Sequence, residues 1–353
     1  MGKYYDGTKL LSMLDIDGNR PELYLVTSNR TAGKTTWFNR YLVKKFLDNG
    51  EKFCLIYRFD YELDMISDKF FKDIGELFFQ EYTMTCERRA KGTYLELFIG
   101  KKDEEGNVAY SSCGYAVSLN KADQVKKLSH LFSDVQRMLY DEFQSETNHY
   151  CNDEISKFIS IHTSIARGQG KQARYVPVFM LSNPVTIINP YYVELGISER
   201  LRVDTKFLKG KGFVLEQAHS DSATEAQNAS GFNKAFSRNK YVAYSAQSVY
   251  LNDNTSFIEK PEGKSSYLCT VRYNGKDYGV KVYPEAGCVY CDDRPDTSFK
   301  VKLAVTTDDH SINYVMLRAN IAVVDMLRYY FDRGCFRFKD LRAKEAIMKA
   351  VSY

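Results

Sequence analysis

The chain has 353 residues, of which 44% are hydrophobic and 14% aromatic, a composition typical of globular chains that bury sizeable cores. Its 49 Lys and Arg residues against 45 Asp and Glu residues give a formal net charge of +4, which permits a polyanionic partner without requiring one. No apolar run approaches the length of a membrane span and Met1–Asp6 lacks the apolar core of a signal peptide, so we expect a cytosolic protein with no membrane partner.

The first predicted elements are a strand, a loop and a helix around Gly33-Lys34-Thr35. Leu23–Thr27 is a short apolar run rich in strand-forming residues, and the residues after Lys34 place aromatic and aliphatic side chains at helical spacing up to a Gly stop at Gly50. Strand, loop, Gly-Lys-Thr and helix together are the context that a phosphate-binding loop requires. In such a loop the backbone N–H groups at the helix N-terminus point toward the phosphates.

This loop predicts a site for ATP and Mg²⁺. The nucleotide is expected to contact Ser28, Asn29, Arg30, Thr31, Ala32, Gly33, Lys34, Thr35 and Thr36. Lys34 would neutralise the β and γ phosphates, and the Thr35 hydroxyl would take one Mg²⁺ position. Ser28 departs from the motif, which usually has Gly there, and Ser fits without strain only if its backbone φ is negative. The alternative interpretation is a surface loop in which Thr35 caps a helix.

The next segments add elements to the same domain. A second buried strand is predicted over residues 51–58 and a helix over residues 63–82, because apolar side chains fall on one face of the latter. Two strand-like runs flank the turn-rich Gly100–Gly106 and predict a β-hairpin.

A further strand, Met138–Phe143, ends in the paired acids Asp141 and Glu142. In phosphate-loop ATPases the strand beside the loop ends in this way: the first acid holds Mg²⁺ through water, and the second polarises the attacking water as general base. The pair therefore favours ATP hydrolysis over phosphoryl transfer to a small molecule. The alternative is an Asp-Glu cap at a helix N-terminus.

After a predicted helix over residues 153–166 and a basic loop, residues 175–181 form a strand of the buried parallel type. It ends at Ser182-Asn183, where a polar side chain can sense the γ phosphate. The order of strands and helices predicts a doubly wound α/β domain over residues 1–205, a P-loop ATPase domain of the additional-strand, catalytic-glutamate type. Its site would lie at the carboxyl ends of the strands.

The second half of the chain has a different pattern. Residues 206–255 include a stretch rich in Ala, Ser, Gln and Asn and are predicted to be a linker region. Strands return from residue 256, with a hairpin signal at Asn274-Gly275, and a long amphipathic helix is predicted over residues 311–332. Residues 256–353 are therefore predicted to form a separate α+β domain.

Together these motifs resemble the DNA-packaging ATPases, or DNA encapsidation proteins, of small short-tailed bacteriophages. The resemblance rests on Ser28–Thr35, which has Arg at its third position, on Tyr140–Phe143, and above all on Leu181–Tyr192, which matches the family's Leu-Ser-Asn run followed by Asn-Pro-Tyr. Shorter matches in the second half are Val271–Gly275, Thr306–Asp309 and Phe336–Phe338. The resemblance spans nearly the whole chain.

The resemblance implies a terminase-like motor, a homo-oligomeric and usually pentameric ring. Such a ring docks transiently on the portal (connector) of a procapsid in the host cytoplasm and uses ATP to drive double-stranded DNA into it. The resemblance also implies that residues 256–353 form an RNase-H-like, vestigial nuclease domain that binds DNA or RNA. Residues 267–273 agree, because they lack the acid that two-metal catalysis would need. Some relatives bind a packaging RNA, which is therefore a further candidate partner.

The motifs and the resemblance together suggest roles for individual residues. The expected catalytic residues are Glu142, Lys34, Arg167 and Asn183, the expected metal ligands are Thr35 and Asp141, and the DNA-binding candidates are Lys121, Lys126 and Lys127. A ring motor needs a cation from the adjacent subunit, an arginine finger. Arg167 is the candidate because it precedes a Gly-rich loop after the acidic strand. Arg174 and Lys171 are the alternatives. It is also possible to interpret this segment as a solvated basic loop with no catalytic role.

Two functions of other classes stay open at this point. One is a P-loop small-molecule kinase or transferase, against which the pair Asp141-Glu142 argues. The other is a non-catalytic nucleotide-binding scaffold protein, for which Ser28 in place of the usual Gly is the best argument.

Overall fold

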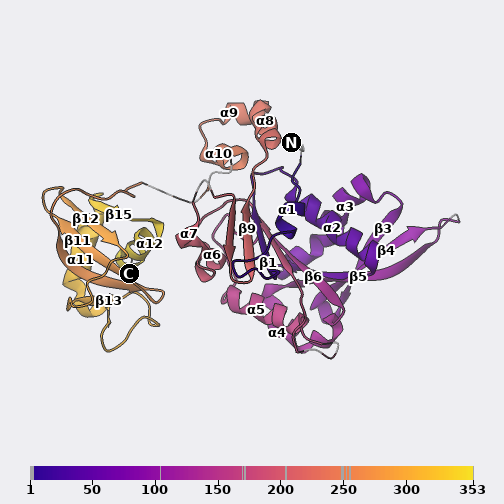
Figure 1. The fold of residues 1–353 in the computed structure, drawn as a ribbon, viewed down its shortest axis with the longest axis horizontal. Coiled ribbons are helices and arrows are strands. Elements are labelled where there is room, and N and C mark those ends of the chain that lie inside the picture. The colour runs from indigo at the N-terminus through magenta and orange to yellow at the C-terminus, as the bar shows by residue number, and fades with distance from the viewer. Residues whose placement is uncertain are drawn as a thin grey trace. The chain divides into compact units, whose positions relative to one another are not determined.

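The computed structural model of the chain describes residues 4–103, 105–168, 170, 172–202, 205–247, 250–251, 253 and 256–352. It divides into two compact units, Met1–Asn252 and Asp253–Tyr353, and each is considered by itself (Figure 1). Within the described residues, no helix has the length and apolar character needed to cross a membrane.

The first unit is built on a nine-stranded sheet with the strand order β3-β4-β5-β2-β6-β7-β1-β9-β8. The strands are β1 Leu23–Thr27, β2 Lys52–Tyr57, β3 Tyr82–Arg89, β4 Tyr94–Lys102, β5 Val108–Ser118, β6 Val135–Asp141, β7 Val178–Ser182, β8 Phe207–Gly210 and β9 Phe213–Gln217. The strands from β5 to β9 in this order run parallel, whereas β3 and β4 at one edge and β8 at the other are antiparallel additions. Because Thr27 pairs with Ser182 and Asp141 pairs with Leu181, the carboxyl ends of β1, β6 and β7 meet at one edge.

Helices cover both faces of this sheet (Figure 1). They are α1 Thr8–Leu11, α2 Lys34–Asn49, α3 Ile66–Phe78, α4 Ala122–Lys127, α5 Glu154–Ile165, α6 Pro190–Glu194 and α7 Ile197–Arg200. The helices α1, α2 and α3 bury Phe38 and Ile74 in one core, and the helices α4, α5 and α6 bury Ile161 and Tyr191 in another. Two cores on opposite faces of a mainly parallel sheet define a doubly wound α/β architecture, as predicted.

The helix α2 carries the residues of the predicted phosphate-binding motif. It begins at Lys34 because Gly33 before it adopts a φ of +90°, a conformation that costs Gly little. Phe38, Leu42 and Val43 are buried on its sheet-facing side. The helix ends at Gly50, whose φ is +71° and whose N–H bonds to carbonyls of the last turn, so the predicted Gly stop is present.

The predicted linker region, residues 206–255, is mostly part of the first unit instead. The strands β8 and β9 extend the main sheet, and β9 pairs in parallel with β1 from Leu23↔Phe213 to Thr27↔Gln217. Three helices follow, α8 Asp221–Ala229, α9 Gly231–Ala235 and α10 Lys240–Gln247, which we call the lid helices. Sequence patterning misses β9 because its apolar run is only Phe213–Leu215, while pairing with a central strand stabilises it.

The second unit is α+β, as predicted. Its six-stranded sheet has the order β14-β13-β10-β11-β12-β15. The elements are β10 Ser266–Tyr273, β11 Lys276–Tyr283, β12 Cys288–Asp292, β13 Lys302–Ala304, β14 Val315–Met316, α11 Ile321–Asp332, β15 Phe336–Phe338 and α12 Leu341–Val351. Both helices contribute buried side chains to one core with the sheet. The helix predicted over residues 311–332 starts only at Ile321, because Val315 and Met316 pair with β13.

Candidate active site

The loop from Ser28 to Gly33 joins β1 to α2 at the carboxyl edge of the sheet. Ser28 is buried, and it is not one of the residues with positive φ, so its position does not require the Gly that the motif usually has. The left-handed positions of the loop are Thr31, with a φ of +62°, and Gly33. The Ser28 N–H donates to the Ser182 carbonyl at 3.3 Å, which ties the loop to the end of β7.

Lys34 and Asn183, predicted from separate motifs, are in direct contact. The Lys34 Nζ donates to the Asn183 Oδ1 at 2.7 Å. Lys34 is 8% exposed, and this burial lowers the pKa of its ammonium while the charges of Asp141 and Glu142 raise it. The side-chain amide at the tip of β7 therefore holds the Lys34 ammonium at the carboxyl ends of the strands.

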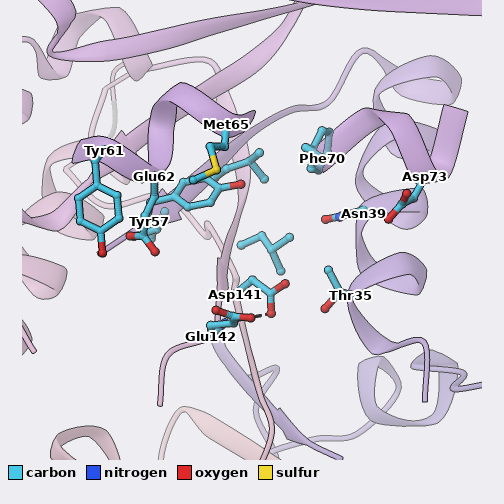
Figure 2. Close-up of a pocket in the computed structure, with 13 residues that line it drawn as sticks. Thr35, Asn39, Tyr57, Tyr61, Glu62, Met65, Phe70, Asp73, Asp141 and Glu142 are labelled. Carbon is cyan, nitrogen blue, oxygen red and sulfur yellow. Dashed lines mark hydrogen bonds between the residues drawn. The ribbon is translucent and has the colours of Figure 1, made fainter. Parts of the chain in front are cut away.

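Asp141, the last residue of β6, lies beside the first turn of α2. Its carboxylate is hydrogen-bonded to the Thr35 side chain; burial raises its pKa, and the nearby Lys34 ammonium acts in the opposite direction. Figure 2 shows both side chains at the wall of a cavity of about 450 Å³, with Glu142 next to Asp141. A hydroxyl and a carboxylate are oxygen donors of the kind that Mg²⁺ prefers, and this ion commonly takes its other ligands from phosphates and water. Thr35 and Asp141 therefore fit a Mg²⁺ ion.

Glu142 follows β6 in a strained backbone conformation. Its φ is +55°, which is uncommon for a residue other than Gly. The Arg58 Nη2 donates to the Glu142 carbonyl at 3.2 Å and to the Phe143 carbonyl at 2.7 Å, and the Glu142 N–H donates to the Asp141 Oδ1 at 2.9 Å. These bonds fix the backbone from which the exposed Glu142 carboxylate reaches the site.

Arg58 is in turn held by a buried carboxylate. Glu154, at the start of α5, is 4% exposed, and its Oε2 accepts from the Arg58 Nε at 3.0 Å. The hydroxyls of Tyr140 and Tyr191 donate to the Oε1 at 2.8 and 2.9 Å, and the Cys151 N–H donates to the Oε2 at 2.9 Å. The sequence does not predict this cluster, and its one signal is the charged residue directly after the buried strand β2.

Arg30, the third residue of the loop, interacts with the lid helices. Its Nη2 pairs with the Glu146 Oε1 at 2.5 Å, and its guanidinium lies over the rings of Tyr241 and Tyr244. Both tyrosine hydroxyls also donate to Glu146, Tyr244 at 2.7 Å and Tyr241 at 3.2 Å. The loop, the segment after β6 and α10 thus share one polar cluster.

Asn29 provides a second attachment between the loop and the lid helices. Its fully buried amide donates from Nδ2 to the Ser220 carbonyl at 3.0 Å and to the Thr224 Oγ1 at 3.1 Å. Its Oδ1 accepts from the Ser220 N–H at 3.0 Å. The Arg30 N–H donates to the Ser245 carbonyl at 3.1 Å. The conformation of the loop is therefore coupled to the position of α8 and α10.

The other predicted loop residues differ in their exposure. Thr31 is exposed, Ala32 is buried, and Thr36 is half-buried in the first turn of α2. The Ala32 carbonyl accepts from the Tyr5 N–H at 2.8 Å.

The candidates for an arginine finger differ in their surroundings. Arg167 is exposed and donates from Nη2 to the Ser129 Oγ at 3.0 Å. Because α5 leads back from the carboxyl end of β6, Arg167 lies away from its own phosphate-binding loop. Arg174 is 8% exposed and donates to the carbonyls of Val135 and Ile165 at 3.0 and 2.7 Å, so it has a structural role. Lys171 lies outside the described residues.

The three predicted DNA-binding lysines are likewise not equivalent. Lys121 pairs with Asp60 at 2.7 Å and donates to the Gly92 carbonyl at 2.9 Å, so its ammonium is engaged within the chain. Lys126 and Lys127 are exposed on α4.

Comparisons with known proteins place these features in a family. The model of the family described as Podovirus DNA encapsidation protein (Gp16) matches residues 1–351. The DNA packaging protein of Bacillus phage phi29 is 25% identical over 316 residues, 89% of this chain and 86% of that protein, and that of Bacillus phage B103 is 25% identical over 337 residues, 94% and 95% of the two chains. A solved structure of the bacteriophage phi29 viral genome packaging motor assembly has the same fold, with a TM-score of 0.69, 23% identity, and coverage of 99% of this chain and 100% of that one.

Proposed function

This chain belongs to the Podovirus DNA encapsidation protein family, and we propose that it is an ATP-driven motor that translocates double-stranded viral DNA into a preformed capsid through the portal. The observation that carries the proposal is the convergence of Lys34, Asn183, Thr35, Asp141 and Glu142 at the carboxyl ends of three neighbouring strands. Parallel α/β sheets bind their ligands at this edge.

Each side chain suits one part of ATP hydrolysis. The backbone N–H groups at the N-terminus of α2 face the phosphates, and the buried Lys34 ammonium neutralises their charge. Asn183, which accepts from Lys34, would contact the γ phosphate or the attacking water. Mg²⁺, when bound at Thr35 and Asp141, would supply further neutralisation of the β and γ phosphates.

Glu142 is the proposed general base. An exposed carboxylate next to the metal-binding acid can accept the proton of the attacking water. Arg58 keeps this carboxylate at the site by bonding to the backbone carbonyl of the same residue, so Arg58 acts as a positioning residue. A carboxylate base next to the metal-binding acid favours hydrolysis over transfer to a small-molecule acceptor.

The other proposed features of the motor involve further protein chains and nucleic acid. We infer a homo-oligomeric ring, with a pentamer as the expected size, in which Arg167 acts on the nucleotide of the adjacent subunit; its exposure and its distance from its own loop support this role. The ring would dock on the portal of the procapsid in the host cytoplasm. A packaging RNA is a further partner to be tested.

The second unit is proposed to be an RNase-H-like domain without nuclease activity. Its strands support this proposal, because β10, β11 and β12 form an antiparallel meander, and β13 and β14 continue in parallel beside β10. Arg272 occupies β10 and pairs with Asp277 at 2.7 Å. Asp292 is paired with the Lys281 ammonium at 2.6 Å.

The test is phosphate release from ATP by the full chain with Mg²⁺, with and without linear duplex DNA. We expect hydrolysis that DNA stimulates, and its loss in Lys34→Ala. Lys45→Ala, at the opposite end of α2, removes the same charge away from the site and is the matched control. Hydrolysis by Lys34→Ala at the parental rate would refute the proposed site, and a phosphorylated small-molecule acceptor on thin-layer chromatography would favour a kinase.

A further inference from the structure

The helix α9 and the turn after it form a basic and aromatic surface that the proposed mechanism does not use. We call it the lid surface and define it by Phe232, Lys234, Phe236 and Arg238. The ring centroids of Phe232 and Phe236 lie 4.9 Å apart, and these residues are 72% and 52% exposed. Lys234 and Arg238 in the same segment are also exposed. From residue 226 to residue 252 the chain has no Asp or Glu, so this stretch of sequence carries a net positive charge.

The lid surface is mechanically connected to the phosphate-binding loop. The Asn233 Nδ2 donates to the carbonyl and to the side-chain oxygen of Gln227 at 2.8 and 2.7 Å, which fixes α9 to α8. The helix α8 is in turn bonded to Asn29, and α10 to Arg30. A displacement of the loop when phosphates bind or leave would therefore be transmitted to α9.

We propose that the lid surface is a DNA-contacting element of the motor, in which Lys234 and Arg238 bind backbone phosphates of duplex DNA. The inference deepens the proposed function and rests on it. A motor that moves any sequence must hold DNA through phosphates and sugars, which carry no sequence information directly. Lys234 and Arg238 are both exposed and suit the phosphates, and exposed rings without hydrogen-bonding groups suit the apolar faces of the sugars.

The connection to the loop distinguishes this surface from another basic stretch. Lys206 and Lys211 lie next to the edge strand β8 and are also exposed, but the hydrogen bonds described for the loop lead to α8 and α10. DNA held at the lid surface would respond to the nucleotide through these bonds, which do not involve the side chains of Lys206 and Lys211. The pair Lys206 and Lys211 therefore offers a control with the same change in charge within the same unit.

The experiment compares three forms of the full chain: the parent, Lys234→Gln with Arg238→Gln, and Lys206→Gln with Lys211→Gln. Binding to a fluorescent duplex is measured by anisotropy from 50 to 200 mM salt, and the thermal unfolding midpoint of each form checks the fold. Each phosphate contact contributes about 0.9 to the slope of log K against log salt. We expect the lid variant to lose about one unit of slope per removed charge and the control variant to keep the parental slope.

Each outcome has a distinct meaning. A parent that does not bind duplex DNA, or binds it without salt dependence, refutes the proposed function itself. A parent that binds with a steep slope while the lid variant keeps the same slope overturns only the present inference. An equal loss in both variants also overturns it, because the effect would then be one of overall charge. A change of oligomeric state in the lid variant, measured by sedimentation, with DNA binding unchanged would identify the surface as a contact between copies of the chain.

Discussion

Removing the charge of Glu154 should destabilise the first unit by about 3–5 kcal/mol, the usual cost of leaving one member of a buried ion pair without its partner. The variant is Glu154→Gln, which keeps the size and one acceptor oxygen of the side chain. In the parent, the Oε2 accepts from the Arg58 Nε and the Cys151 N–H, and the Oε1 accepts from two tyrosine hydroxyls. An amide NH₂ at the Oε2 position would face two donors, and one at the Oε1 position would force both hydroxyls to turn. Each buried donor left unsatisfied costs about 1–3 kcal/mol, and the uncompensated Arg58 guanidinium adds to this.

The assay is urea unfolding followed by tryptophan fluorescence. Trp37 is the only tryptophan of the chain and lies on α2, so the transition reports the first unit and not the second. Asp64→Asn is the control, because it breaks an ion pair with Arg88 at the surface. The Asp64 side chain is 63% exposed and the Arg88 side chain is 37% exposed. Exposed pairs of this kind contribute about 0–1 kcal/mol.

Adding Arg58→Met to Glu154→Gln tests the cause of the loss. If the buried charge is responsible, the double variant should be more stable than Glu154→Gln alone, although the bonds to the carbonyls of Glu142 and Phe143 are gone. A loss of less than about 1 kcal/mol in Glu154→Gln, the range of exposed pairs, would refute the reasoning. A double variant no more stable than the single one would do the same.

Three further predictions concern catalysis, assembly and pH. Glu142→Gln should bind ATP with parental affinity but not cleave it, because the amide cannot accept a proton; nucleotide binding and single-turnover hydrolysis check this, and normal turnover would place the base elsewhere. Arg167→Ala should keep ATP binding but lose DNA-stimulated turnover, and mixing it with Lys34→Ala should restore some activity, because a mixed interface joins one intact pocket to one intact finger. No recovery, with co-assembly shown by sedimentation, would exclude a role in trans. Burial raises the pKa of Glu216, against the opposing hydrogen bond from the Tyr5 hydroxyl, so this carboxyl favours folding below its unfolded pKa and that contribution is lost as pH rises through its folded pKa. Glu216→Gln should therefore make urea unfolding of the first unit less dependent on pH over the mildly acidic range, and an unchanged dependence would contradict the assignment.

The parts of the site that the sequence predicts are those encoded by neighbouring residues. Lys34 and Thr35 follow a strand and start a helix, and Asp141 and Asn183 end strands, so the rule that parallel strands present their carboxyl ends at one edge brings them together. Whether Ser28 can replace the usual Gly without strain depends on the backbone φ at this position. The structure shows that this position does not need a positive φ. That removes the main objection to nucleotide binding.

The parts that the sequence does not predict depend on distant residues. Arg58 and Glu154 are separated by 96 positions, and Asn29 and Ser220 by 191, so no local pattern relates them. Two predictions are wrong for a similar reason: residues 206–255 are not a linker, and the helix predicted from residue 311 starts later. In both places, short segments form strands because they pair with a neighbouring strand. This pairing outweighs their weak intrinsic preference for the strand conformation.

Two backbone amides form hydrogen bonds between the loop and the segment that carries the lid helices. Hydrogen exchange at these amides can therefore report the separation of the lid helices from the loop. The Arg30 N–H is bonded to the Ser245 carbonyl, and the Ser220 N–H is bonded to the Asn29 side chain. An amide protected in this way exchanges with deuterium only when the bond opens. The two amides should therefore exchange at one common rate that is set by separation of the lid from the loop, independent of the rate at which α2 itself unfolds. Native-state exchange would thus time this movement in the unmodified protein.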